Sequence, residues 1–431
     1  MDIIPILVLV LSFVCFLAIG VPVAWSIAIS ALLTMLVSIP AIPAFTTISQ
    51  RIGTGLDSFA LLAIPFFVLS GQLMNKGGIA HRLIAFAKTL VGALPGGLAL
   101  INVIGAMLMG AIAGSAMASA SAMGSILGPE MEKEGYSREF GAAVNITSAT
   151  TGLVIPPSNV LIVYSLASGG VSIAALFLAG YIPGILTGLF LMLVASFWAK
   201  KKKYKLGKRS SLREVFKTFI VAVPSLFLLV VVIGGIVSGI FTATEASAIA
   251  VLYTLLLGFY YKEISFKSLP SILLDSSATT AIVMLLIGTS MSMSWVLSYE
   301  SIPQNISSVL LGISDNPIII LLIINLLLLF VGVFMDMTPA VLIFTPIFLP
   351  VVTKLGMDPV HFGIIMVLNL CVGLCTPPVG SVLFVGVGVA KTTIEKVIKP
   401  LVPLFLAMIL ALFLVTYFPQ LSLWLPSLFD L

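Results

Sequence analysis

The sequence predicts an all-α polytopic membrane protein made of two inverted repeats, each containing a re-entrant hairpin and a discontinuous helix. Composition is the first observation, because 60% of the 431 residues are hydrophobic and only 9% are charged. Apolar stretches such as residues 177–198 and 218–237 can cross about 30 Å of hydrocarbon. The second observation is a duplication: residues 152–157, Gly-Leu-Val-Ile-Pro-Pro, return 221 positions later as residues 373–378, Gly-Leu-Cys-Thr-Pro-Pro.

Scarce residue types support the duplication. Pro129 and Pro350, like Lys133 and Lys354, are separated by the same 221 positions, which apolar composition alone does not explain. In a membrane protein, discontinuous helices at matching places in two repeats indicate the binding site of a secondary transporter. The predicted class of protein is therefore a transporter.

The basic residues predict the topology. Each half is expected to contain five crossings and one hairpin, and an odd number of crossings makes the two halves inverted. Cytoplasmic loops carry an excess of Lys and Arg, so we place the basic linker 200–217 inside. All but two of the 21 Lys and Arg residues, Arg51 and Lys354, then fall in cytoplasmic loops. The first inverted repeat is residues 1–199 and the second is residues 218–431.

A broken helix is expected in each repeat, at about residues 141–168 and 362–390. Consecutive prolines, Pro156 and Pro157 in the first repeat, remove amide donors and leave carbonyl groups without helical partners. Such carbonyls can bind sodium. Unpaired backbone at membrane depth is tolerated only where it is buried in protein or lines a water-filled cavity. A simple proline kink is the alternative for either segment alone, but the equivalent positions of the two favour the break.

A re-entrant hairpin precedes each broken helix, at about residues 97–128 and 317–350. Each consists of two apolar runs that are too short to cross the bilayer readily. Small or flexible residues at 110–116 and 332–339 join the two runs. The alternative is a helix–helix interface of small residues, for which Gly114, Ala118 and Ala122 have suitable spacing. If both hairpins form, the first opens to the cytoplasm and the second to the outside.

Two acids lie in apolar surroundings. Asp336 is at the tip of the second hairpin, and an intramembrane carboxylate is costly enough to suggest function. A direct cation ligand, an acceptor for amides of the tip and a member of a structural pair remain open for it. Glu245 opens a helix, where an acid is usually a cap supported by the helix dipole. Neither acid has a catalytic partner in the sequence.

No Lys or Arg interrupts the broken helices or the hairpin tips. An anionic substrate would therefore be held by helix N-termini, hydroxyls, amides and bound sodium. The candidate substrate-binding residues are Asn145, Ser148, Thr151, Ser158, Asn159 and Asp336. The same groups also permit a neutral substrate.

Several motifs in order resemble one transporter family. They are residues 63–67 (Ala-Ile-Pro-Phe-Phe), 152–159, 242–246 (Thr-Ala-Thr-Glu-Ala), 332–339 with 345–347, and 375–380 (Cys-Thr-Pro-Pro-Val-Gly). Together they resemble the large membrane subunit of tripartite ATP-independent periplasmic (TRAP) transporters, the DctM-like permeases, over nearly the whole chain.

The resemblance implies a sodium-driven elevator transporter in the bacterial inner membrane. It implies import of an organic anion, such as a C4-dicarboxylate, sialic acid or another sugar acid. The implied partners are a small four-helix membrane subunit and a soluble periplasmic substrate-binding protein. No cofactor is expected beyond sodium as the coupling ion.

The resemblance also implies two sodium sites, each between a hairpin tip and a broken helix. The first would use the carbonyls of Gly152, Ile155 and Pro157 with the tip near Gly110 and Ser115. The second would use Gly332, Gly373, Thr376 and Val379.

Other classes of protein fit the sequence less well. The main alternative is a self-sufficient sodium/carboxylate symporter of related fold, which would need no soluble partner. An enzyme would need a convergent catalytic set, and the sequence has only two histidines and three cysteines, the latter in apolar stretches. A channel would give sustained flux in place of saturable coupled uptake. The net charge of +5 resides in loops between spans, so no nucleic-acid partner is expected.

Overall fold

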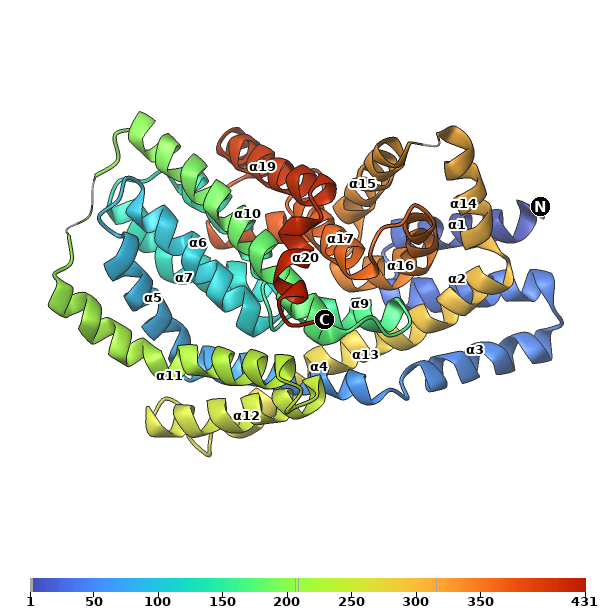
Figure 1. The fold of residues 1–431 in the computed structure, drawn as a ribbon, viewed down its shortest axis with the longest axis horizontal. Coiled ribbons are helices and arrows are strands. Elements are labelled where there is room, and N and C mark those ends of the chain that lie inside the picture. Colours follow the sequence, from blue (N-terminus) through green and yellow to red (C-terminus); the bar gives the residue numbers. More distant parts are fainter. Residues whose placement is uncertain (1–2, 206, 208, 315) are drawn as a thin grey trace.

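The computed structural model describes residues 3–205, 207, 209–314 and 316–431. This part of the chain is helical, with no strand among the described residues (Figure 1). Eight of its helices are long and apolar enough to cross a membrane. The predicted fold class, an all-α polytopic membrane protein, is confirmed.

One group of helices, called here the scaffold, comes from the beginning of each repeat. Its helices are α1 (Ile3–Ala18), α2 (Val23–Ser38), α3 (Ala41–Gly55), α4 (Ala63–Lys76) with the 3-10 turn η1 (Phe59–Leu62) before it, α11 (Leu212–Val237), α12 (Ala243–Tyr260) and α13 (Leu269–Tyr299). Helix α12 packs along α4, and α13 packs against α2, α3 and α4. The two repeats therefore share one scaffold.

The second group, called here the core unit, contains both hairpins and both broken helices. Hairpin 1 is α6 (Gly97–Ala113) with α7 (Ala116–Lys133), and hairpin 2 is α15 (Pro317–Phe334) with α16 (Met337–Lys354). The broken helices are α8 (Arg138–Thr151) with α9 (Asn159–Ala167), and α17 (Pro359–Gly373) with α18 (Ser381–Val389). Helices α10 (Ile173–Lys201), α19 (Ile394–Tyr417) and α20 (Gln420–Ser427) pack on this unit.

Two short helices connect the scaffold to the hairpins. Helix α5 (Ile79–Val91) leads into hairpin 1 and packs on α6 and α11, and α14 (Ile302–Ile313) leads into hairpin 2 and packs on α16. They occupy equivalent places in the two repeats.

The basic linker contains more helix than the sequence suggested. Helix α10 continues to Lys201 and α11 already begins at Leu212, so helices enter both ends of the segment 200–217. The start of α11 is fixed by Ser211, whose hydroxyl accepts a hydrogen bond from the Glu214 backbone amide.

The prediction that Glu245 caps a helix is confirmed at the start of α12. The Thr242 hydroxyl accepts a hydrogen bond from the Glu245 backbone amide at 3.2 Å. The Glu245 carboxylate in turn accepts one from the Thr242 amide at 2.8 Å. This reciprocal arrangement is a capping box, so the acid has a structural role.

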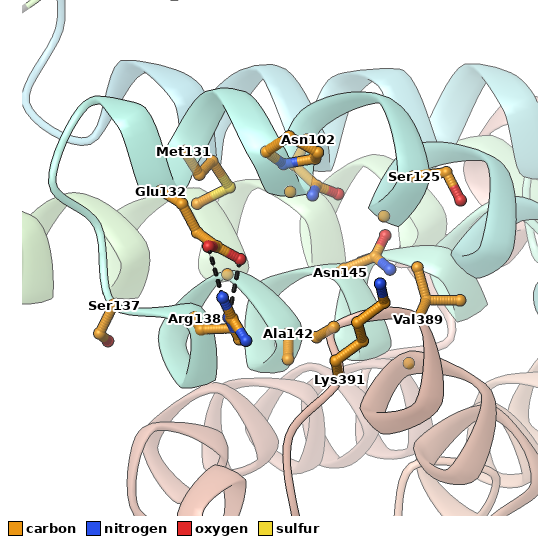
Figure 2. Close-up of a pocket in the computed structure, with 16 residues that line it drawn as sticks. Asn102, Ser125, Met131, Glu132, Ser137, Arg138, Ala142, Asn145, Val389 and Lys391 are labelled. Carbon is orange, nitrogen blue, oxygen red and sulfur yellow. Dashed lines mark hydrogen bonds and ion pairs between the residues drawn. The ribbon is translucent and has the colours of Figure 1, made fainter.

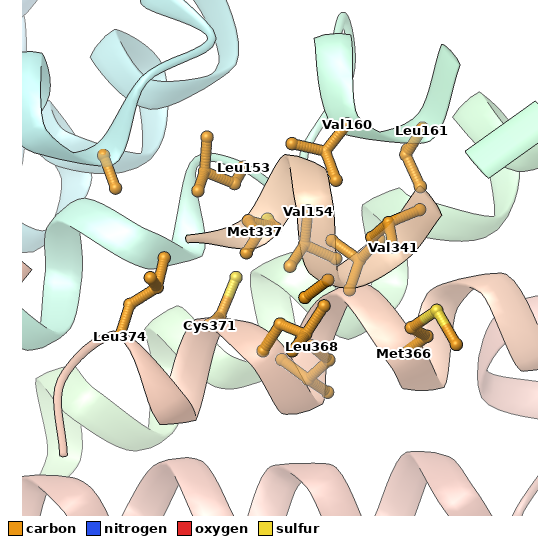
Figure 3. Close-up of a cluster of buried hydrophobic side chains, with 14 of the residues drawn as sticks. Leu153, Val154, Val160, Leu161, Met337, Val341, Met366, Leu368, Cys371 and Leu374 are labelled. Carbon is orange, nitrogen blue, oxygen red and sulfur yellow. The ribbon is translucent and has the colours of Figure 1, made fainter. Parts of the chain in front are cut away.

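The core unit interlocks the two repeats. The first helix of each hairpin packs on the first half of its own broken helix, α6 on α8 and α15 on α17. The second helix packs on the second half of the other broken helix, α7 on α18 and α16 on α9. Figure 3 shows the apolar side chains of α9, α16 and α17 meeting in one cluster. Neither repeat therefore has a closed core of its own.

A contact between equivalent residues marks the centre of this arrangement. The Cys371 thiol donates a hydrogen bond to the Thr150 carbonyl at 3.1 Å, and these two positions are 221 residues apart. Residues related by a two-fold axis can touch each other only where they lie close to that axis. The pseudo-two-fold axis of the repeats therefore passes between α8 and α17.

Candidate functional site

Each broken helix has a break, the non-helical segment between its two halves. Each hairpin tip touches a broken helix at its break through a pair of glycines. A Cβ added to Gly110 would lie 2.5 Å from the Cα of Gly152, and one added to Gly332 would lie 3.1 Å from the Cα of Gly373. A Cβ added to Gly373 would lie 2.6 Å from the Cα of Gly332, and a separation under 3.0 Å leaves no room for a side chain, so both contacts require glycine on the broken helix. The structure thus brings together the glycines predicted for each sodium site.

In the first break, a serine side chain bonds to the backbone. The Ser158 hydroxyl donates to the Leu153 carbonyl at 2.6 Å, on the other side of the two prolines. Ile155 is buried against α10, where it lies next to Gly184. At the tip, the Ser115 hydroxyl accepts the Ala118 amide at 3.3 Å and caps α7. The Pro156–Pro157 peptide bond is cis.

In the second break, the hydroxyl belongs to Thr376 and donates to the Val372 carbonyl at 2.8 Å. The loop then folds back on itself. A Cβ added to Gly380 would therefore lie 2.7 Å from the Leu374 carbonyl oxygen and 2.8 Å from that of Thr376. Val379 is 39% exposed. Backbone oxygens therefore crowd this loop, and hard cations such as sodium prefer oxygen ligands.

A cavity of about 290 Å³, called here the central cavity, lies between the core unit and the scaffold. Both hairpin tips and both breaks line it on one side, and α4 and α13 line it on the other. Its polar side chains are Gln72, Asn75, Ser115, Asn159, Thr279, Asp336 and Thr338. Asp336 is the single charged residue among the described residues that line it.

The predicted substrate-binding residues separate into three groups. Asn159 and Asp336 line the central cavity. Ser148 and Thr151 are buried and turn to other protein groups, since Ser148 donates to Asn102 at 3.2 Å and Thr151 donates to the Ser148 carbonyl at 2.6 Å. Ser158 is likewise engaged with Leu153.

Asn145 lies elsewhere. It lines a second cavity, bounded by α7, α8 and α18 and called here the α7–α8–α18 cavity. Sequence reasoning also missed Gln72, Asn75 and Thr279, the scaffold side of the central cavity. Their polarity within two otherwise apolar helices, α4 and α13, was the signal in the sequence that could have identified them.

Paired hairpin tips and helix breaks around a cavity in an all-helical membrane fold define a transporter. The sequence matches the family described as "Tripartite ATP-independent periplasmic transporter, DctM component" over residues 10–421. This chain belongs to that family, and the resemblance noted from the motifs is confirmed. The homologous proteins are transporter permeases, which also confirms that the chain is not an enzyme.

Three relatives illustrate the match. The protein YgiK of Salmonella typhimurium, described as uncharacterized, is 57% identical over 99% of this chain and 98% of its own length. The isethionate TRAP transporter permease protein DctMQ of Oleidesulfovibrio alaskensis is 41% identical over 97% of this chain and 66% of its own length. The sialic acid TRAP transporter large permease protein SiaM of Vibrio cholerae is 39% identical over 95% and 96%.

A solved structure shares the fold at low sequence identity. The YdaH transporter of Alcanivorax borkumensis superposes with a TM-score of 0.64 and 14% identity, covering 87% of this chain and 88% of that one. At this identity the likeness concerns the fold alone, and it agrees with the transporter architecture.

Proposed function

We propose that this chain is the large membrane subunit of a sodium-coupled TRAP transporter, which imports an organic anion across the bacterial inner membrane. A soluble periplasmic protein delivers the anion, and a small four-helix membrane subunit completes the complex. The observation that carries the proposal is the central cavity, onto which both hairpin tips and both breaks converge.

Charge balance supports sodium coupling. No Lys or Arg is among the described residues that line the central cavity, whereas Asp336 contributes a carboxylate. An organic anion beside Asp336 meets a like charge, and this repulsion is weakly screened inside protein. Sodium ions held by the adjacent breaks offset both charges. Anion and sodium therefore bind together more favourably than either binds alone.

The proposed sodium sites follow the two tip contacts. The first uses Gly110, Ser115, Gly152, Ile155 and Pro157, and the second uses Gly332, Gly373, Thr376 and Val379. Their support is the close approach of the tip glycine to the break glycine in both repeats. The backbone is the common element, since the side chains of the two breaks differ.

An elevator movement is the proposed transport step. Because the two repeats interlock within the core unit, its hairpins and broken helices move as one body against the scaffold. The central cavity lies on the surface between the two groups, so the movement carries its contents across the membrane. The proposed repeats are residues 1–199 and 218–431.

The substrate class follows from the relatives. The names of two of them specify isethionate and sialic acid, which are both anions that carry hydroxyl groups. We extend this to an organic acid for the present chain, with C4-dicarboxylates and sugar acids as the compounds to test first. The soluble protein, a separate chain, then sets most of the selectivity.

Uptake into proteoliposomes tests the proposal. The chain is reconstituted with its neighbouring small subunit, and the binding protein is supplied outside with labelled N-acetylneuraminate or succinate. Accumulation that requires both the binding protein and an inward sodium gradient is expected. Sodium-driven uptake without the binding protein would establish the self-sufficient symporter instead. Uptake that is indifferent to sodium would overturn the coupling.

Thr376→Val tests the second sodium site. The change removes the hydroxyl at nearly constant volume, and loss of one oxygen ligand is expected to raise the half-saturating sodium concentration about fivefold, or roughly 1 kcal/mol. Thr353→Val is the matched control, because Thr353 also donates to the carbonyl four residues earlier but lies in the last turn of hairpin 2. Equal sodium dependence of the two variants would remove Thr376 from the site.

A further inference from the structure

The α7–α8–α18 cavity is polar and charged, with a volume of about 260 Å³ (Figure 2). Its floor contains the amides of Asn102 and Asn145, which are 1% and 2% exposed. Its mouth carries Glu132, Arg138 and Lys391, all exposed. None of these charged groups belongs to the central cavity, so the function proposed above leaves them unexplained.

The cavity breaks the symmetry of the repeats. The equivalent space in the second repeat lies between α16, α17 and α9 and holds the Tyr164 ring, which packs on Gly363 and whose hydroxyl donates to the Pro359 carbonyl at 2.6 Å. At the shift of 221 positions, Thr345, Leu349 and Met366 replace Gly124, Gly128 and Asn145. Thr345 and Met366 are in contact, with 3.3 Å between hydroxyl and sulfur.

Gly128 leaves room in the first space, whereas a Cβ added to Gly124 would lie 2.7 Å from the amide nitrogen of Asn145. A Cβ added to Gly128 would meet no atom within 4 Å, so the protein could fill the space without a clash. The space is open to solvent and is lined by polar groups, so it can admit a small polar ligand.

The charges define what the ligand is. Two nitrogens of Arg138 donate to the Glu132 carboxylate, each at 2.8 Å, so these residues largely neutralise each other. Lys391 takes part in neither of the two ion pairs found among the described residues, and it extends toward the Asn145 amide in Figure 2. The mouth therefore has a net positive charge and favours an anion.

Asn145, on the floor of the cavity, indicates a second chemical group of the ligand. Asn145 donates through its amide nitrogen to the Ala120 carbonyl at 2.7 Å. Its amide oxygen is buried and accepts no hydrogen bond from the residues that the structure describes. A buried acceptor without a donor is unfavourable by about 1–3 kcal/mol. A ligand hydroxyl group supplies the missing donor.

We propose that the α7–α8–α18 cavity is a second ligand site, which binds a small hydroxycarboxylate from the cytoplasm. The carboxylate pairs with Lys391 at the mouth, and the hydroxyl donates to the oxygen of Asn145. The ligand thereby ties the end of α18 to the turn between α7 and α8. Where the ligand is the imported acid, uptake slows as the acid accumulates inside; this consequence rests on the proposed function.

Protection from thiol labelling tests the site. Ser125 lines the cavity and is exposed, so Ser125→Cys in a Cys15→Ser background places a reporter there; the other two cysteines, Cys371 and Cys375, are buried. The full chain in lipid nanodiscs is labelled with a neutral thiol reagent, with L-malate, succinate or inorganic phosphate added at equal ionic strength. Saturating malate is expected to stop labelling, and succinate, which lacks the hydroxyl, is expected to protect less.

Two variants with matched controls complete the test. Lys391→Gln is expected to raise the malate concentration needed for protection about tenfold, because a charge-assisted hydrogen bond is lost. Lys396→Gln is the control and is expected to leave this concentration unchanged. Gly128→Leu copies the second repeat and is expected to abolish protection, whereas Gly234→Leu, whose Cβ also meets no atom within 4 Å, retains it.

The outcomes separate this proposal from the transport function. Equal protection by malate and phosphate would reveal screening of charge and overturn the site, as would labelling that malate does not slow. Lys391→Gln with unchanged protection would also overturn it. Labelling needs neither sodium nor the binding protein, so these results do not depend on whether the transport assay succeeds.

Discussion

Both breaks have a glycine contact with a hairpin tip, but they carry a hydroxyl side chain at different positions. In the first break Ser158 carries the hydroxyl and Ile155 is apolar, whereas at the equivalent positions of the second break Val379 is apolar and Thr376 carries the hydroxyl. The glycine contact with the hairpin tip is present in both. The backbone contact is therefore common to the two breaks, whereas their side chains differ.

A second difference lies beside the first. Hairpin 1 is joined to its broken helix by Ser148, which donates to Asn102 at 3.2 Å. At the equivalent of Ser148 the second repeat has Asn369, whose amide donates to the Asn325 side chain at 2.7 Å and to its carbonyl at 3.0 Å. Both pairs are buried, so each hairpin is held by a polar contact, and the second is the more extensive.

The largest expected effect comes from Gly152→Val. Its side chain would enter the backbone of Gly110, so overpacking is expected to cost about 1–3 kcal/mol or more and lower the thermal unfolding midpoint. Gly332→Val is expected to be milder, because a Cβ on Gly332 would lie 3.1 Å from its nearest neighbour, the Cα of Gly373. Gly234→Val is the control, and similar unfolding midpoints for all three would contradict the required contact.

Asn369→Leu is expected to come next. The change leaves the Asn325 side chain and carbonyl without this donor in a buried place, at a cost of about 1–3 kcal/mol. Ser148→Ala, at the equivalent position, removes one longer hydrogen bond and is expected to cost about 1 kcal/mol. Thermal unfolding of the purified variants measures both. If the two costs are equal, the second pair is not the stronger.

Ser158→Ala is expected to have a smaller effect. It removes the 2.6 Å hydrogen bond to the Leu153 carbonyl, at a cost of about 1 kcal/mol. Val379→Ala is the matched change in the second break, where the side chain is 39% exposed and less is lost. Unfolding midpoints that fall equally would show that the serine hydrogen bond does not distinguish the breaks.

The smallest expected effect concerns pH at the hairpin mouths. The hydrogen bond from Arg138 lowers the pKa of Glu132, whereas the equivalent positions in the second repeat are Thr353 and Pro359. A lowered folded-state pKa gives stability that is present above the unfolded-state pKa and is lost as pH falls through the folded-state value. Glu132→Gln is expected to flatten this acid limb in unfolding measured against pH. An unchanged acid limb would show that other carboxylates cause the loss of stability at low pH.

Local patterns predicted much of the fold. Two prolines after a polar helical run located each break, and short apolar runs around small residues located each hairpin. The position of Glu245 at the start of a helix predicted a cap, and the capping box confirms it. These features depend on neighbouring residues, so one sequence contains the information.

The direction of side chains was less predictable. The hydroxyls of Ser148, Thr151 and Ser158 were expected to face a substrate, but they bond to protein groups. Hydroxyls in a helix often donate to a carbonyl of the preceding turn, as Thr151 does. Polarity within a membrane segment therefore does not by itself indicate a surface that a ligand can reach.

The membrane environment, the duplication, the breaks and the family were predictable from the chain, because composition, spacing and motifs are properties of the chain. Folding in three dimensions was needed to show that each hairpin packs on the other repeat's broken helix, and that Gln72, Asn75 and Thr279 of the scaffold face the central cavity. It also decided that one of two equivalent spaces is hollow. These outcomes depend on contacts between residues far apart in the chain, and packing in three dimensions sets them.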